Sequence, residues 1–77
     1  MLTEALEHLV RGIVDHPDDV EVTMNATRQG RTLQVRVNPE DLGKVIGRNG
    51  RTATALRTVM TAVGGRGIRV DVVDTDR

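Results

Sequence analysis

The spacing of apolar residues changes repeatedly along this chain of 77 residues, and each change predicts a different element of secondary structure. The first apolar residues recur at the spacing of a helix, at Leu2, Leu6, Leu9, Val10 and Ile13. We expect Thr3 to cap this helix at its start. We expect His16-Pro17 to end it, because the residue before a proline disfavours helical conformation.

The apolar period then shortens to two, which is the period of a strand. Apolar residues alternate with polar ones at Val20, Val22, Met24 and Ala26, and again at Leu33, Val35 and Val37. We expect the two strands to form a hairpin that turns near Gly30. Such alternation predicts a sheet with one apolar face buried under helices and one polar face in water.

Two consecutive helices follow the hairpin. Asn38-Pro39-Glu40-Asp41 is typical of a helix start, with a cap residue, a proline in the first position and two acids. This first helix is short and ends at Gly47. A longer helix is predicted from about residue 51 to residue 63, and Gly64-Gly65 ends it. Its expected buried residues are Ala53, Leu56, Val59, Met60 and Val63.

A last strand is predicted at Ile68, Val70 and Val72, and we expect residues 74–77 to form a mobile polar tail. The order of elements is therefore α-β-β-α-α-β. Residues 1–77 are too few for two domains, so we expect one α+β domain with a three-stranded sheet and three helices on its apolar face.

The composition excludes several classes of function. The chain has no Phe, Tyr or Trp, so it cannot stack bases on aromatic side chains. It has no Cys, which excludes disulfides, thiolate metal sites and thiol catalysis and fits a cytoplasmic location. We see no run long enough to span a membrane and no signal-peptide pattern. His8 and His16 have no partners at metal-ligand spacing, and no nucleophile–base arrangement is readable. We therefore expect no catalytic residue, no metal and no cofactor.

The formal net charge is zero, but the charges are segregated along the chain. Residues 1–27 hold six acids and one base, whereas residues 28–69 hold nine bases and two acids. A whole-chain pI near neutral hides this polarity. The positive charge is centred on one short stretch, Gly47-Arg48-Asn49-Gly50.

This tetrad lies between the two consecutive helices and admits three interpretations. It could be a structural corner, with glycines for a tight turn. It could be the turn of a helix-turn-helix DNA-binding motif. It could also clamp a nucleic-acid backbone, because glycines allow close approach and the next helix directs its free N–H groups at the loop.

The residues around the tetrad favour the clamp. Residues 42–50, Leu-Gly-Lys-Val-Ile-Gly-Arg-Asn-Gly, followed by Arg-Thr-Ala-Thr-Ala-Leu-Arg, resemble the signature of KH domains, in which a GXXG loop holds nucleotides. The order of elements is similar to the type II KH arrangement. The length, the opening helix and the closing residues 65–72 resemble small bacterial proteins that consist of a single KH domain. The resemblance covers nearly the whole chain.

The resemblance implies a protein without enzymatic activity that binds about four nucleotides of single-stranded RNA. It implies a role in post-transcriptional regulation or as an RNA chaperone. It also implies pairing with a second copy or with a larger KH-containing bacterial protein. A protein-interaction module with little RNA role remains the alternative.

The expected RNA site follows from the resemblance and from the chemistry of the residues. Arg48 and Asn49 lie at the loop tip, although Asn49 also suits a helix cap. Gly43 costs about 1 kcal/mol in a helix, which either close RNA approach or tight helix packing could explain. The remaining candidates supply charge or an apolar wall for bases, with Arg57 in a secondary role. The complete set is Gly43, Lys44, Val45, Ile46, Gly47, Arg48, Asn49, Gly50, Arg51, Ala53 and Arg57.

Overall fold

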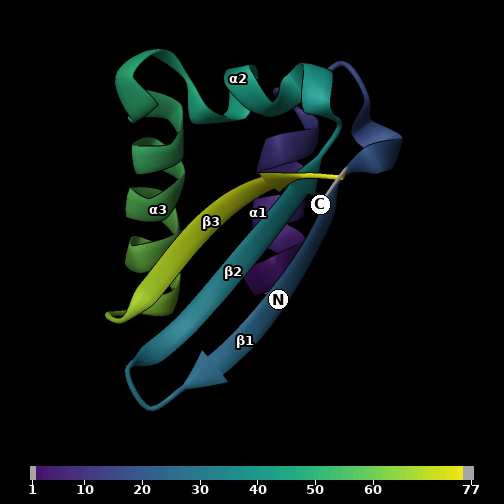
Figure 1. The fold of residues 1–77 in the computed structure, drawn as a ribbon. Helices are drawn as coiled ribbons and strands as arrows, with labels where there is room; N and C mark the ends of the chain where they lie inside the picture. Colours follow the sequence, from purple (N-terminus) through teal and green to yellow (C-terminus); the bar gives the residue numbers. More distant parts are fainter. Residues whose placement is uncertain (1, 76–77) are drawn as a thin grey trace.

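A three-stranded sheet forms the centre of the computed structural model, which describes residues 2–75 (Figure 1). Strand β1 (Glu21–Thr27) runs antiparallel to β2 (Gly30–Val37), as expected for a hairpin. Strand β3 (Ile68–Asp74) lies parallel to β2 on its other side. The strand order β1-β2-β3 leaves β3 at an edge of the sheet.

Three helices lie on one face of this sheet: α1 (Leu2–Arg11), α2 (Leu42–Ile46) and α3 (Arg51–Gly64). Short 3-10 turns precede β1, α2 and α3, at Pro17–Asp19, Pro39–Asp41 and Arg48–Gly50. The predicted element order and the α+β class with one covered sheet face are confirmed. None of the helices within residues 2–75 combines the length and the apolar character needed to cross a membrane.

The core consists of aliphatic side chains from the three helices, the central strand β2, the start of β3 and the residue before β1. The buried apolar residues are Leu6, Val10, Val20, Leu33, Val35, Val37, Val45, Leu56, Met60 and Ile68. In β2 the odd-numbered residues from Leu33 to Val37 face the helices. Because Leu33 pairs with Val70 and Thr32 with Arg69, Val70 shares the covered face and Arg69 lies on the uncovered face.

The boundaries of α1 differ from prediction at both ends. The helix already includes Leu2, so Thr3 lies inside it and is not its cap. The helix ends at Arg11, well before His16, because Gly12 is a poor helix former, and residues 12–13 form a turn. Pro17 instead occupies the first position of a 3-10 turn.

Some predicted core positions are exposed. Met24 in β1 is 46% exposed, because β1 is an edge strand with a neighbouring strand on one side only. In α3, Val59 and Val63 are 44% and 65% exposed, whereas Leu56 and Met60 are buried. The helix lies at the side of the sheet, so only one narrow stripe of it meets the core.

The predicted helix start at Asn38 and the predicted helix end at Gly64-Gly65 agree with the structure. The side chain of Asn38 accepts a hydrogen bond of 2.9 Å from the Glu40 N–H, as a helix cap does. The longer helix stops at Gly64, and Gly65 follows with a positive φ of 93°. In the predicted tail, Asp74 belongs to β3 and the Thr75 N–H donates to the Val37 carbonyl at 2.9 Å. Residues 76–77 of that prediction lie outside the described residues.

Candidate nucleic-acid interface

The loop at Gly47–Gly50 has a left-handed backbone at three of its four residues. The φ angles are 77° at Gly47, 57° at Asn49 and 75° at Gly50. Asn49 is the only residue other than glycine with positive φ in the described chain, and asparagine tolerates this conformation better than most residues. A helical Arg48 followed by a left-handed Asn49 is the backbone pattern that forms concave anion sites.

Asn49 does not cap the next helix, although its residue type suits a cap. The residue before α3 is Gly50, and no side chain caps this helix. Asparagine suits this position because it tolerates the left-handed backbone conformation. The sequence alone could not distinguish this role from a capping role.

The glycines around the loop are not equivalent. A Cβ added at Gly47 would overlap the Thr52 hydroxyl and lie 2.8 Å from the Thr52 backbone nitrogen. At Gly50 and Gly43 an added Cβ would meet nothing within 4 Å. Gly47 is therefore required for the loop to pack on α3. Close helix packing does not explain Gly43, which leaves an open surface on α2.

The N-terminus of α3 is a positively charged end that lacks acidic neighbours. The first turn of the helix contains no Asp or Glu, Arg51 is its first residue, and Arg48 lies in the 3-10 turn just before it. Within residues 2–75, neither arginine makes a hydrogen bond or ion pair with another side chain. Cations are unfavourable at a helix N-terminus, so this arrangement favours an anionic ligand.

A hollow continues from this end between α3 and the edge strand. It has a volume of about 100 Å³ and is lined by Ala53, Thr54, Arg57 and Val70. We call it the α3–β3 groove. Sequence reasoning included Ala53 and Arg57 in the site but missed Thr54 and Val70. The alternation of β3 could have placed Val70, since it predicts which residues face the helices.

Two other predicted site residues lie differently from expectation. Val45 is fully buried in the core, so its side chain cannot form part of a wall for bases. Its neighbour Ile46 is 36% exposed and can. Lys44 does not stand free beside the loop, because its Nζ contacts the Asp15 carboxylate.

A buried carboxylate connects α2 to the segment that follows α1. Asp41 is only 1% exposed and accepts hydrogen bonds from the backbone N–H of Asp15 at 3.2 Å and of His16 at 3.0 Å. The His16 Nδ1 lies 2.9 Å from the same carboxylate. We call this set of contacts the Asp41 clasp. No sequence spacing indicated this set of contacts, because Asp41 is 26 residues from Asp15 and 25 residues from His16 in the sequence.

The clasp changes the ionisation of both side chains. The hydrogen bond to Asp41 raises the pKa of His16 above its ordinary value of 6.5. Burial alone would raise the pKa of Asp41, but the hydrogen bonds from His16 and from the Asp15 backbone outweigh burial and lower it. The charged forms of both side chains are thus favoured together.

These shifts predict that stability depends on pH. The raised pKa of His16 gives stability that is complete below pH 6.5 and is lost as pH rises through the folded-state pKa. The lowered pKa of Asp41 gives stability above 3.8 that is lost as pH falls through its folded-state pKa. We expect the melting temperature to fall as the pH rises from about 6.5 through the raised pKa of His16.

Thermal unfolding by circular dichroism across this pH range checks the expectation. His16→Asn, whose amide can still donate to Asp41, should give a flatter profile, whereas the matched variant His8→Gln should keep the wild-type slope. Equal slopes in all three proteins would show that the clasp does not carry the pH dependence.

Within residues 2–75, no group of three or more His, Asp or Glu side chains is placed to hold a metal ion. The side chains that the structure brings together at the loop are instead cations, amides and small apolar groups. This chemistry suits an extended polyanion.

Comparisons with known proteins identify the family of the chain. The family model described as the KhpA/KhpB KH domain matches residues 3–73. The chain is 72% identical to the RNA-binding protein KhpA of Streptomyces coelicolor over 76 residues, which cover 99% of this chain and 96% of that protein. It is 68% identical to the KhpA of Mycobacterium tuberculosis over 77 residues, which cover 100% and 96% of the two chains.

A more distant relative, the KhpA of Halalkalibacterium halodurans, is 43% identical over 72 residues, covering 90% of this chain and 95% of the relative. No solved structure matches the chain significantly. The family is one of RNA-binding KH domains and is not a family of enzymes. The family match includes all of every helix and strand except the first residue of α1 and the last of β3, and the chain belongs to the KhpA/KhpB family of KH domains.

Proposed function

We propose that the chain binds short segments of single-stranded RNA through the Gly47–Gly50 loop and the α3–β3 groove. Phosphates lie against the loop backbone, Arg48 and Arg51, and about four nucleotides fit the site, as in other KH domains. Bases lie against Ile46, Ala53 and Val70, because the chain has no aromatic side chain on which to stack them. Gly43 lets the RNA approach α2 closely.

The observation that carries this proposal is the uncapped, arginine-flanked N-terminus of α3. The positive end of the helix dipole and the two arginines favour an anion at the same point. Nothing in the described chain supplies that anion. The names of the close relatives, which are RNA-binding proteins, support RNA as its source.

A salt titration tests the proposal. Binding of a labelled RNA of about four nucleotides, followed by NMR or fluorescence anisotropy, should weaken about tenfold between about 50 and 200 mM salt. The loss arises because each phosphate contact releases counterions. The amide signals of residues 47–51 should shift on binding. An affinity that does not change with salt concentration would contradict phosphate recognition at the loop.

A second function, self-association, is favoured by the outer face of α3. Val59 and Val63 are exposed there together with the small residues Ala55 and Ala62, which follow the helical spacing. We propose that this stripe pairs with a second copy of the chain, and that the same face serves pairing with KhpB, whose KH domain belongs to the same family. Pairing would join two weak RNA sites and raise the avidity. The proposed setting is the cytoplasm, in post-transcriptional regulation or RNA chaperoning.

Sedimentation velocity checks the pairing. The wild-type chain should sediment as a dimer at concentrations where Val63→Glu sediments as a monomer, because the charge would be buried in the interface. Val63 is largely exposed in the single chain, so the variant should keep its circular dichroism spectrum. Thr61→Glu, on an exposed position outside the stripe, is the matched control. A monomeric wild type at high concentration would contradict self-association.

A further inference from the structure

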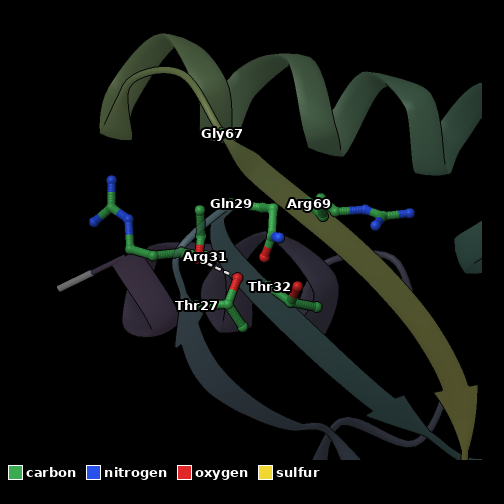
Figure 2. A pocket seen from close by; sticks show the side chains of 7 residues that line it. Thr27, Gln29, Arg31, Thr32, Gly67 and Arg69 are labelled. Carbon is green, nitrogen blue, oxygen red and sulfur yellow. Dashed lines mark hydrogen bonds between the residues drawn. The ribbon is translucent and has the colours of Figure 1, made fainter.

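A pocket of about 290 Å³ lies on the uncovered face of the sheet, at the end where β1 turns into β2 (Figure 2). It is separate from the α3–β3 groove, with which it shares no lining residue. Its walls include the side chains of Thr27, Gln29, Thr32 and Arg69 and the backbones of Gly30 and Gly67.

The floor of this pocket is rigidly built. The Arg31 N–H donates to the Gly67 carbonyl at 2.9 Å, which joins the starts of β2 and β3. A Cβ added at Gly30 would overlap that carbonyl group, so the two backbones touch. The guanidinium of Arg31 is held by the Gly64 carbonyl oxygen at 2.5 Å, which fixes the same corner to the end of α3.

The chemistry of the lining suits an anion. The side-chain donors are the Thr32 hydroxyl and the Gln29 amide, with the Arg69 guanidinium at the edge of the sheet, and none of the lining residues is acidic. The Thr27 hydroxyl donates its one proton to the Gly30 carbonyl at 3.2 Å, so it stabilises the turn and is not a donor to the anion. Arg28 and Arg66, in the two turns beside the pocket, are exposed and add positive charge around it.

The position of the pocket relates it to RNA. Val70 lines the α3–β3 groove, and the preceding residue of the same strand, Arg69, lines the pocket. The Cα atoms of these two residues are about 3.8 Å apart, so the two sites adjoin across strand β3. Strand β3 is an edge strand, and within residues 2–75 no further strand lies beside its free edge. In Figure 2 the Arg69 side chain extends away from Gln29 and Thr32 and beyond β3. A polynucleotide that leaves the groove over this edge meets Arg69 first and then the pocket.

We propose that this pocket binds the phosphodiester backbone of RNA that extends beyond the groove, with Arg69 as the contact at the edge of the sheet. The proposal rests on RNA binding at the Gly47–Gly50 loop. It makes the footprint of one chain longer than the four nucleotides of the groove. We expect the pocket to bind RNA without base preference, because its donors contact the phosphodiester backbone, which is the same in every RNA sequence.

The test compares two lengths of unstructured RNA, about four and about eight nucleotides, where the shorter fills the groove alone. The wild-type chain should bind the longer RNA more tightly, and only the longer RNA should shift the amide signals of Thr32 and Gly67. Arg69→Gln should leave the affinity for the shorter RNA within about twofold of the wild type and weaken the affinity for the longer RNA by about five- to tenfold. For the longer RNA, the slope of the logarithm of the binding constant against the logarithm of the salt concentration should be smaller in magnitude by about one.

Two further variants keep the result specific. Arg11→Gln removes the same charge from α1, where Arg11 pairs with Glu7 at 2.7 Å, and should change neither affinity. Thr32→Val removes a hydroxyl without changing charge and should weaken only the longer RNA, by about twofold. Equal weakening of both RNAs by Arg69→Gln would assign Arg69 to the groove and overturn the proposal, and so would no weakening of either. Failure of the unchanged chain to bind the shorter RNA would instead refute the proposed function, and this extension with it.

Discussion

Replacing Arg48 and Asn49 together by aspartate is expected to reduce the affinity for a short RNA by roughly a hundredfold, corresponding to about 3 kcal/mol, because charged hydrogen bonds to phosphate are lost. The two new carboxylates would stand at the loop tip and repel the phosphates. The fold should persist, because both side chains are exposed and aspartate, like asparagine, tolerates the left-handed conformation at position 49.

Binding measured by anisotropy or NMR, with circular dichroism as the folding control, decides this prediction. Arg11→Asp combined with Asn25→Asp changes the net charge equally at exposed positions far from the loop in sequence. That variant should bind the short RNA almost as the wild type does. Comparable losses in both double variants would indicate a general charge effect, and retained affinity in the loop variant would refute the clamp.

Gly47→Ala is expected to destabilise the fold far more than Gly50→Ala. Both residues have positive φ, which costs alanine about 1 kcal/mol. Only at Gly47 would the new methyl group meet Thr52, including its backbone nitrogen at 2.8 Å, and such overpacking adds about 1–3 kcal/mol. For a chain of this size the melting temperature should fall by more than about 10 °C in Gly47→Ala and by about half that or less in Gly50→Ala.

Thermal melts of the two variants give the comparison directly. The double variant Gly47→Ala with Thr52→Ser identifies the cause, because serine lacks the Thr52 methyl group but keeps the backbone and the hydroxyl. It should recover little stability, since the backbone nitrogen and the hydroxyl remain in place. Equal melting temperatures for Gly47→Ala and Gly50→Ala would show that the contact with Thr52 is unimportant.

Local chemistry made the second half of the fold predictable. The Asn38 cap and the Gly64-Gly65 stop act through neighbouring backbone groups, so the sequence alone predicts both correctly. The alternation of β2 likewise predicts its buried face.

Long-range contacts account for most of what sequence could not predict. The segment after α1 is held by Asp41, which is distant from it in sequence, so the sequence did not predict the path of this segment. The exposure of Val59 and Val63 depends on how much of α3 its neighbours cover. Lys44 and Val45 were placed in the RNA site by charge and hydrophobicity. Their engagement by Asp15 and by the core follows only from the folded chain.

The fit of Gly47 against Thr52 has a consequence for how tightly a site this small can bind. The contact fixes the loop while the chain folds, so the left-handed backbone is already in place before any ligand reaches the proposed RNA site. Ordering a flexible loop on binding would cost conformational entropy, which would weaken every complex equally. A preorganised loop avoids this cost, and the few contacts of a short footprint then contribute their whole free energy to affinity.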